Sequence, residues 1–514
     1  MKLIAETRSG QVEGVRRDQH TVFRGIPYAL PPTGARRFSA PEPAAPWSGV
    51  RACLHAGPVA LQGTTFASGM EVGQPESEDC LTLNVYTPAL DDGRRPVLFW
   101  IHGGAFTVGA SSVPLYDGAA LCQRGDVVVV TVNYRLGLFG FLDLGEQGEA
   151  FGAQPNLGIL DQLLALEWVR HNIAHFGGDP ANVTVFGESA GATSVAALLI
   201  APRARGLFRR AIAQSTALHQ RLPSRELAAR TTHAILAKLG VQPGDVARLR
   251  ELPAETLVRA QREAERESLG WRAFFPVRHP GSLPRHPDEA HADPSQPNVP
   301  LIVGSNRDEW NLFDAGNVAR WGTPLEAAEE EARLAQLARW LPRAEPAKVR
   351  ALVPVYRESR AALGLPHDAR SLLRAIEGDL IFHLSGVRLA EAYARAQRPV
   401  YTYRFTHMSP ALRGALGACH ALELPFVFGT YEQPMQQRFA GQGPAVAALS
   451  ASMMRCWLHF AREGAPGPVL DARGQERDWP AYELERRPTL MFGSEREVAL
   501  DPFGSEREAW RELV

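Results

Sequence analysis

The segment from residue 183 to 199 constrains the fold of this chain more than any other. It begins with the run Val-Thr-Val-Phe, continues through the turn Gly-Glu-Ser-Ala-Gly at 187–191, and ends in a stretch rich in Ala and Leu. We interpret this order as a strand, a sharp turn and a helix. Such a turn strains the backbone of Ser189 and lifts its hydroxyl above the end of the strand, where it can act as a nucleophile.

Two glycines flank the serine and permit this turn. Gly187 and Gly191 lack side chains, so the incoming strand and the outgoing helix can pass close together. The helix points its free N–H groups at the serine and favours the negative charge that develops when a carbonyl group is attacked. A Gly-x-Ser-x-Gly pattern also arises by chance in a chain with 46 glycines. A catalytic interpretation therefore depends on partners elsewhere in the chain.

The residues around this segment predict an α/β architecture. Apolar runs at 96–101 and 126–132 are typical of strands covered on both faces of a sheet. Apolar positions between 157 and 173 recur near helical spacing. The alternation of strands and helices from 95 to 215 predicts a doubly wound sheet that binds ligands beyond the carboxyl ends of its strands. Further strands are expected near 80–87, 207–212, 299–305 and 399–405.

We expect the 514 residues to form one domain with helical insertions. Residues 224–268 and 325–396 are charged and rich in Ala, Leu, Arg and Glu, which is typical of exposed helices. We therefore predict insertions at about 220–298 and 320–396 that wall the site. The predicted fold class is α/β, with a large, mostly parallel central sheet flanked by helices.

Composition narrows the range of partners. The formal net charge is −1 and no block of like charges occurs, so nucleic acid is not an expected partner. No apolar run reaches the length of a membrane span, and the first eight residues lack the apolar core of a signal peptide. The five cysteines are widely spaced, without a Cys-x-x-Cys metal pattern. We predict a cytoplasmic protein with reduced thiols that acts on a small neutral molecule, as a monomer or dimer.

A serine hydroxyl needs help to become a nucleophile. A histidine has to accept its proton, and a carboxylate has to orient that histidine. In α/β-hydrolases the chain order is serine, acid, histidine, with the last two on loops after later strands. Asp308 and Glu309 follow the strand expected at 299–305, and His420 follows the one at 399–405. From the residues alone, either carboxylate can be the acid.

Six segments resemble the type-B carboxylesterase and lipase family, which includes the cholinesterases, and are closest in pattern to the bacterial p-nitrobenzyl esterases. They occur in the order found in that family and are Phe23–Ala29, Glu78–Tyr86, His102–Phe106, Phe186–Gly191, Gly304–Glu309 and His420–Phe426. The resemblance implies one α/β-hydrolase catalytic domain over residues 1–514. It also implies a serine carboxylesterase that acts on small esters through an acyl-enzyme and needs no metal or other cofactor.

The resemblance assigns a role to each of these motifs. It implies a catalytic triad of Ser189, Glu309 and His420, and it favours Glu309 over Asp308 as the acid. Because His420 has to be neutral to accept a proton, activity is expected to fall below roughly pH 6 to 7.

The resemblance also implies an oxyanion hole formed by the backbone N–H groups of Gly103, Gly104 and Ala190. The two glycines have no side chains to keep an oxyanion from their amides. Ala190 follows the nucleophile, where the mechanism expects a donor.

Four other reactive residues lie in or near the motifs. His102 is expected to shape the oxyanion loop, and His383, in an apolar run, to be a core histidine. Glu188, beside the nucleophile, is expected to be a buried hydrogen-bonded partner rather than a second base. Cys419 adjoins His420, but no nucleophile elbow carries it.

The candidate pocket residues are inferred only from the position of their segment in the family pattern. Trp271, Phe274 and Phe275 lie in the segment that lines the acyl side of the gorge in relatives, which implies a preference for short acyl chains. The alternative, that these aromatic residues belong to the ordinary core, stays open.

The chain departs from the family pattern in three places. Trp310 stands where a glycine usually follows the acid, and it either narrows the site or packs beneath it. Arg278–Pro280 replaces the usual Val-Asp-Gly, so the family pattern does not predict the conformation of the loop near the acyl pocket. Cys80 pairs in secreted relatives with an upstream cysteine, but Gly57–Gln62 contains none. The resemblance therefore implies that Cys80 forms no disulfide. Cys53 stays open as a less favoured partner for it.

Two other functions compete with the esterase. Lipases and amidases use the same triad, and the motifs do not separate them. A non-catalytic binding module is the other, but family members that serve in adhesion have typically lost the nucleophile, whereas this chain retains Ser189.

Overall fold

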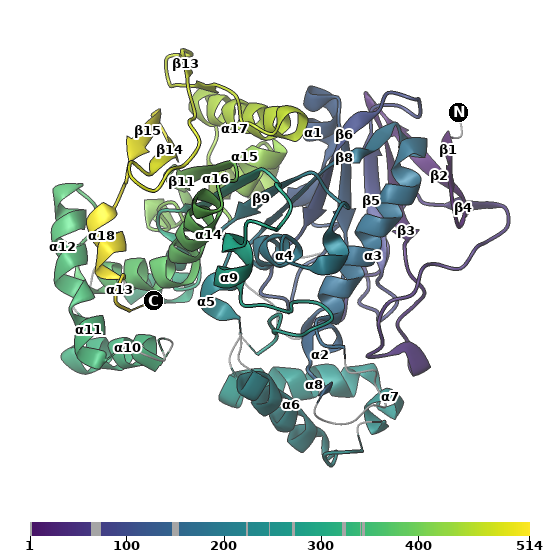
Figure 1. The fold of residues 1–514 in the computed structure, drawn as a ribbon, viewed down its shortest axis with the longest axis horizontal. Coiled ribbons are helices and arrows are strands. Elements are labelled where there is room, and N and C mark those ends of the chain that lie inside the picture. The colour runs from purple at the N-terminus through teal and green to yellow at the C-terminus, as the bar shows by residue number, and fades with distance from the viewer. Residues whose placement is uncertain are drawn as a thin grey trace.

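A computed structural model describes residues 3–62, 73–145, 154–222, 225–245, 247–269, 273–320, 325–339, 341 and 345–513. In this part of the chain, 13 strands form one large sheet that crosses the whole molecule (Figure 1). Its strands are β1 (Leu3–Thr7), β2 (Gly10–Arg17), β3 (His20–Pro27), β4 (Val50–Ala52), β5 (Thr82–Thr87), β6 (Arg95–Ile101), β7 (Val128–Val132), β8 (Gly178–Glu188), β9 (Arg210–Gln214), β10 (Leu301–Asn306), β11 (Val400–Phe405), β14 (Pro488–Phe492) and β15 (Arg496–Leu500). A separate hairpin pairs β12 (Val469–Leu470) with β13 (Glu476–Arg477).

The strand order is β1-β2-β3-β5-β7-β6-β8-β9-β10-β11-β14-β15, with β4 beside β2. All strands from β7 through β6, β8, β9, β10 and β11 to β14 are parallel, and antiparallel strands extend the sheet at both edges. This confirms the predicted α/β class with a mostly parallel central sheet. The strands expected from 80 to 405 are all present. The edge pair β14 and β15 was not predicted, because its short segments lie among charged residues.

Helices cover both faces of the sheet (Figure 1). They are α1 (Ala119–Gly125), α2 (Gly137–Phe141), α3 (Leu157–Asn172), α4 (Ala190–Leu198), α5 (Leu218–Arg221), α6 (Arg225–Leu239), α7 (Arg248–Glu251), α8 (Ala254–Ala264), α9 (Pro287–Ala292), α10 (Ala327–Arg339), α11 (Pro346–Arg350), α12 (Leu352–Ala362), α13 (Ala369–Gly378), α14 (Leu384–Arg395), α15 (Leu424–Phe428), α16 (Pro434–Ala440), α17 (Pro444–Glu463) and α18 (Gly504–Ala509). Figure 1 shows α6, α7 and α8 together at the bottom of the view and α10, α11 and α12 at the lower left. Both blocks lie within the ranges expected for insertions.

The side chains of the central strands alternate between two cores. In β6, Val97, Phe99 and Ile101 join the core that includes α3 and α4, whereas Leu98 and Trp100 join the core that includes α17. This is the pattern expected of a strand buried on both faces. Because β8, β9, β10 and β11 are successive parallel strands of the sheet, their carboxyl ends lie at one edge.

Candidate active site

Ser189 lies in the single-residue turn between β8 and α4. Its φ of 56° and ψ of −118° belong to a region that residues other than glycine rarely adopt. The backbone N–H of Ser189 donates to Gln214 O at 2.8 Å. Its carbonyl accepts from Thr193 N at 2.9 Å and from Thr193 Oγ1 at 3.0 Å. Hydrogen bonds on both sides of the residue therefore hold the strained conformation in place.

The two glycines of the motif are required by close packing. A Cβ atom at Gly191 would lie 1.9 Å from Ile101 O, and one at Gly187 would lie 2.6 Å from Gly191 O. These contacts press the turn against the end of β6. Any side chain at either position would displace Ser189 from the strand end.

His420 and Glu309 meet at the same edge of the sheet. Nδ1 of His420 lies 2.6 Å from Oε2 of Glu309, which is 1% exposed. The other carboxylate oxygen, Oε1, accepts from Ser215 Oγ at 2.6 Å and from Asn306 N at 2.7 Å. A carboxylate held by three donors can fix both the tautomer and the orientation of the imidazole ring.

Asp308 is turned toward arginines instead. Its carboxylate contacts Arg307 at 2.8 Å and Arg360 at 3.2 Å, and it accepts from Ala418 N at 2.9 Å. Burial opposes ionisation, but the two guanidinium groups outweigh it and hold the pKa of Asp308 below its usual range. The structure thus brings Glu309, not Asp308, to His420.

Glu188 contacts the opposite nitrogen of His420. Its Oε1 lies 2.9 Å from Nε2, outside the alignment of a hydrogen bond. Since Glu188 directly precedes Ser189, this contact places Nε2 toward the turn that carries the serine. Burial alone would lower the pKa of His420, but Glu188 and Glu309 together raise it well above 6.5.

A third buried carboxylate, Glu423, completes the cluster. It accepts from Gln214 Nε2 at 3.0 Å and from Asn306 Nδ2 at 2.6 Å. Burial, with the charges of Glu188 and Glu309 nearby, raises the pKa of Glu423 to about 7. Glu423 belongs to neither the triad nor the oxyanion hole predicted from the sequence. Its place three residues after His420 was the one signal for it.

The pH profile follows from this cluster. A protonated His420 cannot accept a proton, so activity is lost as pH falls through its pKa, and the raised pKa moves that loss above pH 6.5. The structure therefore shifts the expected acid limb upward from the range inferred from sequence. Glu188→Gln removes one of the two raising charges and should lower the acid limb of kcat/KM by about one pH unit. A limb that does not move in the variant would contradict this account.

Of the two glycines of the candidate oxyanion hole, Gly103 lies beside the nucleophile. A Cβ at Gly103 would be 3.1 Å from Ser189 Cβ and 2.6 Å from Glu188 Oε2. Gly104 has a φ of +107°, and a Cβ there would be 2.1 Å from Val108 O. Ala190, 2% exposed, is the first residue of α4. The backbone of Gly103 and Ala190 therefore lies next to Ser189, and Gly104 follows Gly103 in the chain.

His102 and His383 have structural partners, as expected. His102 Nδ1 lies 2.8 Å from Gly103 O, and its ring stacks on Tyr134 at 4.5 Å. Burial lowers the pKa of His102 to about 4. His383 Nδ1 lies 3.1 Å from Ser305 Oγ, and burial, with Arg404 nearby, lowers its pKa to about 3. Both rings are thus neutral near pH 7.

The aromatic residues proposed from the family pattern fall in different places. Trp271 lies outside the described residues. Phe274 and Phe275 are buried in the core, and the Phe275 ring lies 5.1 Å from that of Phe106, in the oxyanion loop. The altered segment 278–280 leads into a turn in which His279 and Leu283 exchange backbone hydrogen bonds of 2.9 and 2.8 Å.

Aromatic rings that the sequence analysis did not single out cover His420. The Phe382 ring lies 4.4 Å from the imidazole and the Phe313 ring 5.1 Å from it. Trp310 is half-buried in the turn Glu309–Asn311 and packs on Phe313 at 4.8 Å. Trp310 therefore supports the aromatic cover of His420 through Phe313.

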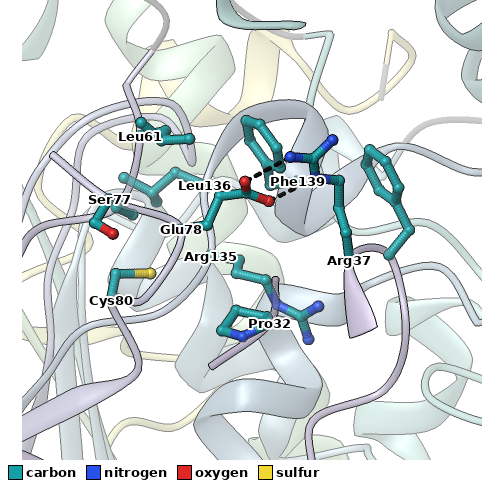
Figure 2. A pocket seen from close by; sticks show the side chains of 11 residues that line it. Pro32, Arg37, Leu61, Ser77, Glu78, Cys80, Arg135, Leu136 and Phe139 are labelled. Atoms are coloured by element: carbon teal, nitrogen blue, oxygen red, sulfur yellow. Dashed lines mark hydrogen bonds and ion pairs between the residues drawn. The ribbon is translucent and has the colours of Figure 1, made fainter. Parts of the chain in front are cut away.

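Two hollows in the described part of the chain lie away from this cluster. A cavity of about 10 Å³ is lined by Arg37 and Glu78, which form a bidentate ion pair, and by Cys80 (Figure 2). A wider cleft of about 530 Å³ is lined by residues that include Arg17 and Asp117. Neither is lined by Ser189, Glu309 or His420.

All five cysteines are buried free thiols, and burial raises the pKa of Cys80.

The described residues contain neither a candidate membrane span nor a candidate metal site. None of their helices combines the length and apolar character needed to cross a bilayer. Nor do three or more of their His, Cys, Asp or Glu side chains gather as ligands for a metal ion.

Comparison with known proteins covers nearly the whole chain. Residues 2–510 match the model of the carboxylesterase family. The chain is 40% identical to the para-nitrobenzyl esterase of Bacillus subtilis, with 98% of each covered, and 36% identical to the phenmedipham hydrolase of Pseudarthrobacter oxydans, with 97% of each covered. A solved carboxylesterase of Geobacillus stearothermophilus superposes with a TM-score of 0.86 at 42% identity, over 99% of this chain and 100% of the other. The chain belongs to the carboxylesterase family and is a carboxylic ester hydrolase.

Proposed function

We propose that this protein hydrolyses small carboxylic esters by serine catalysis, with Ser189 as nucleophile, His420 as base and Glu309 as the acid that orients it. The hydrogen bond of 2.6 Å between Glu309 and His420, at the edge where the strained Ser189 turn ends β8, carries this proposal. The names of two relatives, an esterase for a p-nitrobenzyl substrate and a hydrolase of phenmedipham, support it.

The proposed first half-reaction forms an acyl-enzyme. His420 Nε2 accepts the proton of Ser189 as Oγ attacks the carbonyl carbon, and the carbonyl oxygen becomes an oxyanion. The backbone N–H groups of Gly103, Gly104 and Ala190 stabilise that charge. The imidazolium then gives its proton to the departing alcohol, and the acyl group stays on Ser189.

In the second half-reaction, water replaces the alcohol. His420 removes a proton from water, hydroxide attacks the acyl carbonyl, and the same oxyanion hole stabilises the second intermediate. Transfer of the proton back to Ser189 releases the carboxylic acid. Glu309 keeps Nδ1 protonated throughout, because a carboxylate can only accept a hydrogen bond from it.

The acyl-chain preference tests the proposed substrate class. The rings of Phe313 and Phe382 lie beside His420, and Trp310 packs on Phe313, so we expect kcat/KM to be highest for acetyl to hexanoyl p-nitrophenyl esters. Dodecanoyl esters should react about tenfold more slowly or worse. A maximum at the long end, or higher activity on emulsified triglyceride or anilides, would instead favour the lipase or the amidase.

A further inference from the structure

The oxyanion loop, residues 102–109, folds back so that its end packs against its start. Thr107 N and Val108 N both donate to Gly104 O at 3.0 Å. Gly109 has a φ of +110°, and a Cβ there would lie 2.6 Å from His102 Nδ1 and 2.7 Å from Gly103 O. The backbone of Gly109 is therefore the surface against which Gly103 rests.

One side chain pairs with both backbone groups of Gly109. Gln62 Nε2 donates to Gly109 O at 3.0 Å, and Gly109 N donates to Gln62 Oε1 at 3.0 Å. This is the two-bond pairing that antiparallel strands use, made here by a primary amide. It fixes the peptide planes on both sides of the Gly109 Cα atom.

Gln62 is itself anchored by two other segments. Its backbone N–H donates to Glu76 Oε2 at 3.1 Å, and its carbonyl accepts from Arg262 NH2, on α8, at 2.9 Å. These bonds hold the backbone of Gln62, so only its side-chain torsions are fixed when the amide pairs with Gly109, and the amide can hold the loop in one position.

The other contacts of the loop hold different residues. Gly137 N donates to Phe106 O at 2.6 Å, and Tyr134 Oη donates to His102 O at 2.8 Å. Within the described ranges, Gln62 is the one residue whose hydrogen bonds hold Gly109. Its loss would leave a buried N–H and a buried carbonyl without a partner, which a shift of the loop would relieve.

We propose that Gln62 is a positioning residue for ester hydrolysis: its amide holds Gly109, and through Gly109 it holds Gly103 where the oxyanion forms. The inference rests on the proposed function, because it takes Gly103 as an oxyanion donor. A displacement of about 1 Å at such a site can cost about 100-fold in rate.

The test compares Gln62→Ala and Gln62→Glu with the wild type. Glutamate matches glutamine in size but cannot donate to Gly109 O, so it removes the pairing with little change in volume. Both variants should lower kcat for p-nitrophenyl butyrate by about 10- to 100-fold while KM stays within about threefold, since the oxyanion charge exists only in the transition state. Active enzyme is counted by titration with a fluorophosphonate.

A matched control and an inhibitor separate positioning from folding. Gln74→Ala removes an amide whose Oε1 accepts from Ser112 Oγ at 2.9 Å, just outside the loop, and should keep kcat within about twofold. A trifluoromethyl ketone forms an anionic tetrahedral adduct on the serine. Its Ki should rise in the Gln62 variants by the same factor by which kcat/KM falls.

Two results would overturn the inference. One is a Gln62→Glu enzyme with kcat and ketone Ki within about twofold of the wild type. The other is a fall in kcat without any change in ketone affinity. Failure of the wild type to hydrolyse the ester would instead count against the proposed function, so the two failures are distinguishable.

Discussion

Ser189→Ala is expected to lower kcat for p-nitrophenyl butyrate by about 10⁴- to 10⁶-fold. The variant removes the oxygen that attacks the substrate, and no neighbouring group can replace it: Cys419 is buried, and burial raises the pKa of its thiol well above the usual value. The residual rate should come from the oxyanion hole and substrate binding alone.

The fold of this variant should be unaffected. The Ser189 hydrogen bonds given by the structure use its backbone N–H and carbonyl, which alanine keeps. Alanine at a φ of 56° is as strained as serine, so we expect the melting temperature to change little. Activity within about tenfold of the wild type would contradict the assignment of Ser189 as nucleophile.

Glu309→Gln is expected to lower kcat by about 10³- to 10⁴-fold. A glutamine amide that points its N–H toward Nδ1 requires the other tautomer of His420, in which Nε2 carries the proton and cannot accept one from Ser189. The variant also removes a charge that raises the pKa of His420, so its acid limb should move to lower pH.

The neighbouring Asp308→Asn variant is the matched control. Asp308 pairs with Arg307 and Arg360 rather than with His420. Its replacement by asparagine removes the negative charge that these two guanidinium groups share. We expect a loss of stability of about 3 kcal/mol, with kcat per folded enzyme within about threefold of wild type. The reverse outcome, with Asp308→Asn inactive and Glu309→Gln active, would show that the acid is Asp308.

Local sequence was enough to predict the strands and the serine turn. The serine turn is predicted by contiguous residues: the apolar run before Ser189, the two glycines beside it and the Ala-rich segment after it. Each of these local patterns predicts its own conformation, namely strand, turn and helix. The parallel order of β8, β10 and β11 then follows from the alternation of strands and helices. The edge strands β14 and β15 were missed because their short segments lie among charged residues, which hide the apolar pattern.

The surroundings of His420 could not be predicted in this way. Asp308 and Glu309 are adjacent and chemically alike, and Asp308 differs in pairing with Arg307 and with Arg360, which is 52 residues away on α12. Phe382 reaches the imidazole only because the turn after α13 packs against the loop of His420. Contacts between segments so distant in sequence leave no local pattern.

The most direct test of the central claim is the mass of the intact protein after reaction with a fluorophosphonate, followed by peptide mapping. The account predicts one adduct per chain, on Ser189, with hydrolysis lost in proportion to labelling. An adduct on another residue that abolishes activity, or full hydrolysis of esters by a chain that takes up no probe, would contradict it.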